Sequence, residues 1–154
     1  MDVLTFETPL GAMALESSGG AIVRLLLPGQ PLPPSAGSPS SLLEEGRAQL
    51  LDYLVQKRRA FDLPLCPQGT AFQRRVWEAL CRIPWGETRT YGQLAQSIGA
   101  PKAARAVGQA NHRNTIPIFI PCHRVIGQNG SLTGYGGGLH WKEYLLALEA
   151  AHRP

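Results

Sequence analysis

The sequence predicts an α+β protein of two small domains, and three observations carry this prediction. Residues 2–27 alternate apolar and polar side chains, with turn signals at 9–11 and 19–20, as antiparallel strands do. Several later segments repeat apolar residues at helical spacing. Between these parts, the segment 60–69 ("AFDLPLCPQG") is interrupted by two prolines and a glycine. We therefore expect an N-terminal α/β domain at 1–67 and a second domain at 68–154.

In the first domain, the strands are followed by a loop and one helix. Residues 28–41 contain five prolines and no charge, so we expect a flexible loop without packed structure. Apolar residues at helical spacing then predict an amphipathic helix at about 41–57. Ser40 or Ser41 is a candidate N-cap, and Glu44 would complete a capping box with Ser41.

The second domain begins with a helix capped by Thr70 and ended by Pro84. The stretch "TYGQLAQSIGAPKAARAVGQANHRN" then predicts a helix-turn-helix, with helices at about 91–98 and 101–112. Gly99 fits the residue after the first helix, and Pro101 fits the first turn of the second. A helix pair that binds nothing is the alternative. A last helix is expected at about 139–151.

Charge is unevenly distributed along the chain, whose formal net charge is +4. Residues 1–67 hold 5 basic and 7 acidic side chains (−2), and residues 68–154 hold 10 basic and 4 acidic ones (+6). A basic second half is typical of a nucleic-acid-binding face, although a solvated basic surface gives the same pattern.

Several classes of protein are disfavoured by the sequence. No apolar run is long enough to span a bilayer, and the N-terminus lacks the pattern of a signal peptide, so a cytoplasmic location is expected. The three cysteines are odd in number and form no Cys-x-x-Cys pair, so neither disulfides nor a zinc site is expected.

The stretch "IPIFIPCHRVIG" (116–127) places Cys122 and His123 side by side behind Pro121. A thiol becomes an effective nucleophile when a basic neighbour favours the thiolate, and Glu149 is a candidate to orient that His. Adjacent side chains on a strand point to opposite faces, so this pairing needs a turn at 121–123 or a bridging water. The alternative is a buried core thiol beside a structural His.

The motif "IPCHRVI", preceded by "PKAARAVGQANHRNTIPIFI" and followed by "GYGGGLHWKEYLLALE", resembles the O6-alkylguanine-DNA alkyltransferase family over about residues 70–150. The resemblance implies a ribonuclease-H-like N-terminal domain and a winged-helix-like C-terminal domain. It also implies a monomer that binds alkylated double-stranded DNA in the minor groove, flips the base and uses no cofactor or metal. The alkyl group of O6-alkylguanine, with O4-alkylthymine as a second candidate substrate, would be transferred irreversibly to the protein in one turnover.

The resemblance also implies roles for individual residues. Cys122 matches the alkyl acceptor, His123 the base that draws its proton through a water, and Glu149 the acid that orients this His. Asn114 matches the residue that ties the second helix to the active-site turn. Tyr91 matches the DNA-contacting phenol near the flipped base and its phosphate, which is the best candidate to donate a proton to the leaving guanine. Arg105 matches the arginine inserted into the base stack. The other expected DNA contacts are Ala103, Lys102, Arg113 and Arg124, and the expected base pocket is Val125, Tyr135, Gly136 and Asn111.

Two positions depart from other family members. Gly136 stands where some members have Ser, and Asn111 stands where the human member has Met, so the pocket lip is expected to be more polar. Three other functions compete with alkyl transfer: a lesion-binding module without transfer, a helix-turn-helix regulator and a Cys hydrolase. The presence of Cys122 argues against the first, and the regulator leaves Cys122 and His123 unexplained. A hydrolase is disfavoured because His123 is placed where it could not act as a direct base.

Overall fold

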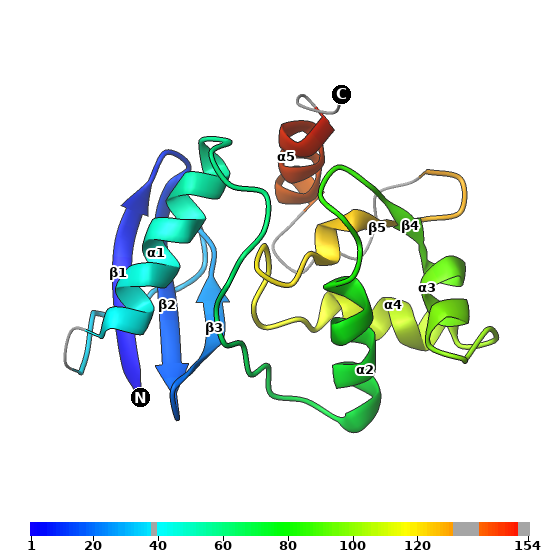
Figure 1. The fold of residues 1–154 in the computed structure, drawn as a ribbon, viewed down its shortest axis with the longest axis horizontal. Helices are drawn as coiled ribbons and strands as arrows, with labels where there is room; N and C mark the ends of the chain where they lie inside the picture. The colour runs from blue at the N-terminus through cyan, green and yellow to red at the C-terminus, as the bar shows by residue number, and fades with distance from the viewer. Residues whose placement is uncertain (38–39, 131–138, 151–154) are drawn as a thin grey trace. The chain divides into compact units, whose positions relative to one another are not determined.

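The computed structural model describes residues 1–37, 40–130 and 139–150, and Figure 1 traces them. The chain divides into two compact units, Met1–Gln68 and Gly69–Pro154. The first unit contains an antiparallel sheet and one helix, and the second is mainly helical. The expected α+β class is confirmed. None of the described helices is long and apolar enough to cross a membrane.

The sheet of the first unit has the order β1-β2-β3, with strands Asp2–Thr8, Gly11–Ser18 and Ala21–Leu26. Its antiparallel register pairs Leu4 with Leu15. The β2–β3 hairpin turns at Gly19 and Gly20, whose φ angles are 61° and 82°. Because both turn residues need positive φ, this turn confirms the signal in the sequence.

Helix α1 (Ser41–Leu54) packs on this sheet. Gly46 allows the close approach, since an added Cβ would lie 3.0 Å from Leu15 and 3.1 Å from Ile22. Ser40 caps the helix by accepting a hydrogen bond from the Leu43 N–H, so the candidate box at Ser41 does not form. The helix ends before residue 57 because Gln56 takes φ 65° and the Lys57 N–H turns back to the Asp52 carbonyl at 2.7 Å.

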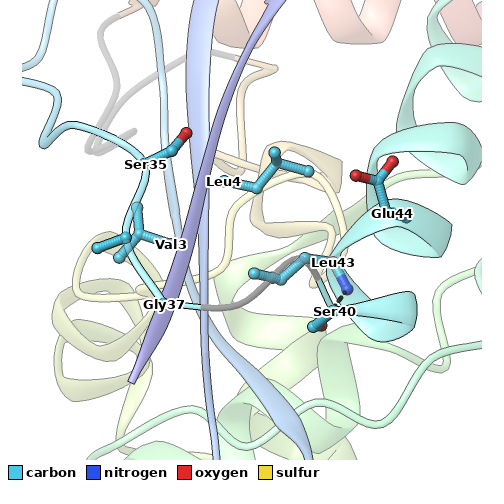
Figure 2. Close-up of a pocket in the computed structure, with 8 residues that line it drawn as sticks. Val3, Leu4, Ser35, Gly37, Ser40, Leu43 and Glu44 are labelled. Atoms are coloured by element: carbon cyan, nitrogen blue, oxygen red, sulfur yellow. Dashed lines mark hydrogen bonds between the residues drawn. The ribbon is translucent and has the colours of Figure 1, made fainter.

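The proline-rich segment differs from its prediction, because part of it packs along the free edge of β1. Val3 and Ala36 exchange two backbone hydrogen bonds of 2.9 and 3.0 Å. The Thr5 side chain donates to the Pro33 carbonyl at 2.7 Å, and the Thr5 N–H donates to Ser35 at 3.0 Å. An edge strand offers unpaired N–H and C=O groups, and an extended segment satisfies them. A pocket of about 150 Å³ is lined by β1, this segment and the start of α1. Figure 2 shows residues that line it: Val3, Leu4, Ser35, Gly37, Ser40, Leu43 and Glu44.

The segment expected to be a linker also takes part in the first unit. The Ile22 N–H donates to the Pro64 carbonyl at 2.9 Å, and the Cys66 N–H donates to the Ile22 carbonyl at 2.8 Å. Leu65 therefore forms a parallel bridge with Ile22 of β3. The prolines did not reveal this pairing, because residues on either side of a proline can still join the edge of a sheet.

The second unit begins with α2 (Ala71–Leu80), which Thr70 caps in a box with Gln73. It ends at Leu80, before the predicted stop at Pro84, and its last turn tightens into i to i+3 hydrogen bonds. Strand β4 (Arg89–Thr90) leads directly into α3 (Tyr91–Ser97). Gly99 follows α3 with φ 76°, as predicted.

Helix α4 (Ala104–His112) begins later than predicted. Pro101 and Lys102 form a turn in which the Ala103 N–H donates to the Ala100 carbonyl at 2.9 Å. Proline is as well suited to the second position of a turn as to the first turn of a helix, and here the turn is formed. Lys102 and Ala103 therefore precede the helix.

The remaining elements follow a buried apolar run at 116–120. A 3-10 helix, η1 (Cys122–Arg124), leads into β5 (Val125–Ile126), which pairs in parallel with β4. Helix α5 (Leu139–Ala150) ends the described chain and packs against η1. Figure 1 shows β5 beside β4.

Candidate active site

The site is built around the turn that carries Cys122. Pro121, with φ −79° and ψ 63°, ends the apolar run, and η1 follows at once. The Cys122 N–H donates to the Ile120 carbonyl at 2.7 Å, and the Arg124 N–H donates to the Pro121 carbonyl at 3.0 Å. Cys122 is only 3% exposed. The turn that the pairing of Cys122 with His123 requires is therefore present.

Two asparagines from the end of α4 and the residues after it hold this turn in place. The Asn114 side chain donates to the Ile120 carbonyl at 2.9 Å and accepts from the Ile116 N–H at 3.0 Å. The Asn111 side chain donates to the Cys122 carbonyl at 3.3 Å. These hydrogen bonds connect the helix-turn-helix to the candidate nucleophile.

A buried charge cluster lies next to the thiol. His123 Nε2 is 2.8 Å from Glu149 Oε2, and neither side chain is more than 2% exposed. Arg124 donates to both carboxylate oxygens at 2.9 Å and to the Ile83 carbonyl at 2.7 Å. The Gly86 N–H adds a further donor to Glu149 Oε1 at 3.1 Å. Helix α5 thus supplies one carboxylate that binds the last two residues of η1 and the Gly86 backbone.

Burial and hydrogen bonding set the protonation of this cluster. Burial alone would raise the pKa of Glu149, but hydrogen bonds from His123 and Arg124 outweigh it and hold the pKa far below its usual range. Burial lowers the pKa of His123, although Glu149 opposes the shift. We therefore assign a neutral His123 with its proton on Nε2, because an ionised carboxylate can only accept. Nδ1 is then left as an acceptor.

The geometry corrects the expectation that Arg124 contacts DNA. Its side chain is 8% exposed, and its guanidinium is held by the Glu149 carboxylate and the Ile83 carbonyl. A guanidinium held in this way cannot reach a phosphate without breaking a buried ion pair. The adjacent position of Arg124 in the motif does not reveal this, because the partner lies 25 residues away.

A groove with a volume of about 670 Å³ lies along α3 and α4. It brings together three of the expected residues, Tyr91, Arg105 and Arg113, with both arginines exposed. Lys102 is exposed in the preceding turn, and Ala103 stands at the start of α4. The other lining residues are Ala104, Gly108, Gln109 and His112.

The expected base pocket is only partly described. Val125 is fully buried in β5, opposite Arg89 of β4. Asn111 is 1% exposed and holds the Cys122 turn. Tyr135 and Gly136 lie outside the described residues.

One buried charge at this site, Lys142 on α5, was not among the residues expected from the sequence. Its side chain is fully buried, and its Nζ lies 5.8 Å from the centre of the Tyr91 ring. Burial lowers its pKa to about 8, and a thiolate at Cys122 would oppose that shift. A signal was available: Lys142, Leu145 and Glu149 fall at i, i+3 and i+7, on one face of the last helix.

Within the described ranges, no group of three or more His, Cys, Asp or Glu side chains is arranged to hold a metal ion. The chemistry that these residues offer is that of a thiol, an imidazole, a phenol and an ammonium group.

Known proteins resemble this chain over nearly its whole length. A family model described as the DNA-binding domain of 6-O-methylguanine DNA methyltransferase matches residues 71–151. A methylated-DNA–protein-cysteine methyltransferase of Methanosarcina acetivorans is 47% identical over 150 residues, covering 95% of this chain and 96% of its own. The constitutive methyltransferase of Bacillus subtilis is 45% identical over 153 residues, covering 94% and 93%.

Solved structures agree with the sequence relatives. The O6-methylguanine methyltransferase of Mycobacterium tuberculosis is 44% identical, with a TM-score of 0.87, and 99% of this chain and 95% of that chain are covered. A structure of the M. tuberculosis protein OGT in complex with DNA is 42% identical, with a TM-score of 0.86 and coverage of 99% and 94%. With relatives this similar and this completely covered, the chain belongs to the methylated-DNA–protein-cysteine methyltransferase family.

Proposed function

We propose that this protein repairs DNA by direct reversal, moving the alkyl group of O6-alkylguanine in duplex DNA onto its own Cys122. O4-alkylthymine is a second candidate substrate. The observation that carries the proposal is the buried His123–Glu149 hydrogen bond of 2.8 Å beside Cys122, in a chain of this family. In classification terms the protein is an S-methyltransferase, but each molecule acts once.

The reaction is a displacement at carbon. Cys122 loses its S–H proton through a water to His123 Nδ1, and Glu149 holds the imidazolium that forms. The thiolate then attacks the alkyl carbon, forming a C–S bond as the bond from that carbon to guanine O6 breaks. The electron pair leaves with guanine, which takes up a proton for which the Tyr91 phenol is the candidate donor. The thioether product has no leaving group as good as guanine, so the transfer is irreversible.

The target base must first leave the stack, because the alkylated oxygen of a paired guanine lies inside the duplex. Flipping costs a few kcal/mol. The groove along α3 and α4 offers Arg105 to fill the gap and Arg113 to contact phosphate. Its small residues, such as Gly108, suit close approach to the minor groove. The Val125 carbonyl, Tyr135, Gly136 and Asn111 would form the base pocket.

The proposal extends to the whole protein acting as a monomer, without cofactor, in the cytoplasm. Within the described residues, Cys66, Cys81 and Cys122 are all free thiols, which suits a reducing compartment.

The decisive test is the mass of the intact protein and of its peptides after mixing with excess duplex containing one O6-methylguanine. We expect one methyl group per protein, on the peptide with Cys122, and none in Cys122→Ser. An unmodified protein that still binds the lesion would show a recognition module instead. Methylation of another cysteine would remove Cys122 from the acceptor role.

A further inference from the structure

Two buried acceptor atoms beside Cys122 have no hydrogen-bond partner among the described residues. They are Asn111 Oδ1 and His123 Nδ1. The two residues are 1% and 0% exposed, so bulk water does not reach them. Buried polar atoms without partners destabilise a fold, and they are rarely left so unless they serve a function.

The orientation of both groups is fixed by their other hydrogen bonds. The Asn111 Nδ2 donates to the Cys122 carbonyl at 3.3 Å, which leaves Oδ1 as the atom without a partner. His123 Nε2 faces Glu149 Oε2 at 2.8 Å, which leaves the Nδ1 lone pair. Asn111 therefore binds the Cys122 carbonyl, and His123 follows Cys122 in η1. Each side chain is left with one acceptor atom and no remaining donor.

A single water molecule matches this arrangement. Water has two O–H donors for the two acceptors, and its oxygen can accept the S–H of Cys122. Three partners are the usual number for a buried water. We propose that Asn111 Oδ1 and His123 Nδ1 share one water, and that Asn111 is a positioning residue that orients this water for proton transfer from Cys122.

This inference rests on the proposed function. In the proton transfer from Cys122 to His123, Asn111 has a defined role. The S–H bond breaks and its proton passes to the water oxygen. The water gives one of its own protons to His123 Nδ1 and is regenerated. Asn111 binds the second O–H throughout and neither gains nor loses a proton. Without that acceptor the water can rotate, and its alignment between thiol and imidazole is lost.

This assignment gives Asn111 a part in proton transfer besides its place in the proposed base pocket. A side chain without a polar atom at this position would leave the water without its second acceptor.

The experiment compares the full-length protein with Asn111→Leu, which has a similar volume but no polar atom. Iodoacetamide, without DNA, modifies Cys122, and peptide mass gives the rate from pH 5.5 to 9.5. We expect Asn111→Leu to react about tenfold more slowly at pH 7 and to approach the wild-type rate above about pH 9. The reason is that hydroxide then removes the proton directly, near the ordinary thiol pKa of about 8.5.

Control variants distinguish the loss of water positioning from a change in folding. Gln96→Leu changes an exposed amide on α3 outside the groove and should keep the wild-type profile. Asn111→Met is a second apolar variant if Asn111→Leu fails to fold. Profiles of equal shape, whether equal in rate or uniformly slower, would overturn the proposal.

A second arm measures single-turnover methyl transfer from the lesion duplex with the same proteins. If the wild type takes up no methyl group but the iodoacetamide profiles differ as expected, the proposed function fails and the water relay stands. If methyl transfer occurs and the profiles coincide, the relay role of Asn111 is wrong and the proposed function stands.

Discussion

At the residue scale, Glu149 decides the chemistry of the site, because it binds the two residues of the turn that follow Cys122 at once. Its carboxylate accepts hydrogen bonds from His123, Arg124 and the Gly86 N–H. One group therefore holds His123 in a defined tautomer and neutralises a buried guanidinium. Orientation of the base and stability of the domain cannot be separated at this residue.

Glu149→Gln should lower the free energy of unfolding by about 3–5 kcal/mol, because it leaves Arg124 buried without an anion. The low pKa of Glu149 means that the unfolded chain takes up the proton first as the pH falls. The stability advantage of the wild type over Glu149→Gln is therefore full above pH 4.5, the ordinary pKa of this carboxyl, and declines below it.

Urea unfolding at pH 7 and pH 3 measures both effects. Glu143→Gln, which changes an exposed carboxylate on the same helix, is the matched control and should change stability little. Equal losses in the two variants at pH 7 would show that the buried pair does not stabilise the domain.

Lys142 makes a second prediction at this scale, in a higher pH window but with the same direction in pH. Its pKa is about 8 in the fold against an ordinary 10.5, so between these values the unfolded chain holds more protons. The contribution of Lys142 to stability therefore rises with pH across that window. The difference between the two pKa values corresponds to roughly 3 kcal/mol.

Lys142→Met should accordingly be more stable than the wild type at pH 7, by up to about 3 kcal/mol, and the gap should close between pH 8 and 10.5. Thermal unfolding across this range measures it. Lys57→Met, at an exposed position, is the matched control for replacing a lysine with methionine. A constant gap for Lys142→Met would mean that this lysine is charged equally easily in both states.

At the element scale, the start of α3 links the fold to the groove. Thr90 accepts from the Gln93 N–H at 3.1 Å, and Gln93 accepts from the Thr90 N–H at 2.9 Å. This capping box fixes the first turn of α3, and that turn begins with Tyr91. Strand β4, which pairs with β5, fixes the same point from the other side.

Thr90→Ala should cost about 1 kcal/mol of stability, the usual value for losing a cap. Because Tyr91 follows directly, alkyl transfer should slow as well. Denaturant unfolding and single-turnover transfer test the two parts of the prediction. Thr88→Ala, two residues earlier and exposed, should leave both unchanged. Full stability in Thr90→Ala would show that tertiary contacts, not the cap, hold this turn.

At the scale of the whole molecule, the structure shows which basic side chains of residues 68–154 are exposed and which are buried. The exposed arginines Arg105 and Arg113 lie in one groove of the second unit, while Arg124 and Lys142 are buried. The +6 charge of residues 68–154 therefore overstates what DNA can meet, because some of that charge lies inside the domain.

Binding to undamaged duplex should weaken as salt rises, with a slope of about −0.9 in log K against log salt for each phosphate contacted. Arg113→Gln should reduce the size of this slope by about 0.9 if Arg113 contacts one phosphate. Fluorescence anisotropy across a salt series measures it. Lys57→Gln, in the first unit, should leave the slope unchanged. An unchanged slope for Arg113→Gln would place the phosphate contacts elsewhere.

The sequence by itself determined the α+β class and the local features of the chain. Both hairpin turns, the cap at Thr70 and the turn after α3 at Gly99 lie where the pattern predicts them. These features depend on φ angles and hydrogen bonds within a few residues, so neighbouring sequence is enough to specify them. The site motif around Cys122 was also recognisable, because its residues are close together in the chain.

Only the tertiary structure decided which charges are buried and with what partners. The local motif does not indicate that Arg124 is buried, because the carboxylate that pairs with it belongs to Glu149, 25 residues away on α5. Lys142 is charged, yet it is fully buried under Tyr91. In each case the outcome depends on contacts between segments far apart in sequence, and packing sets those contacts.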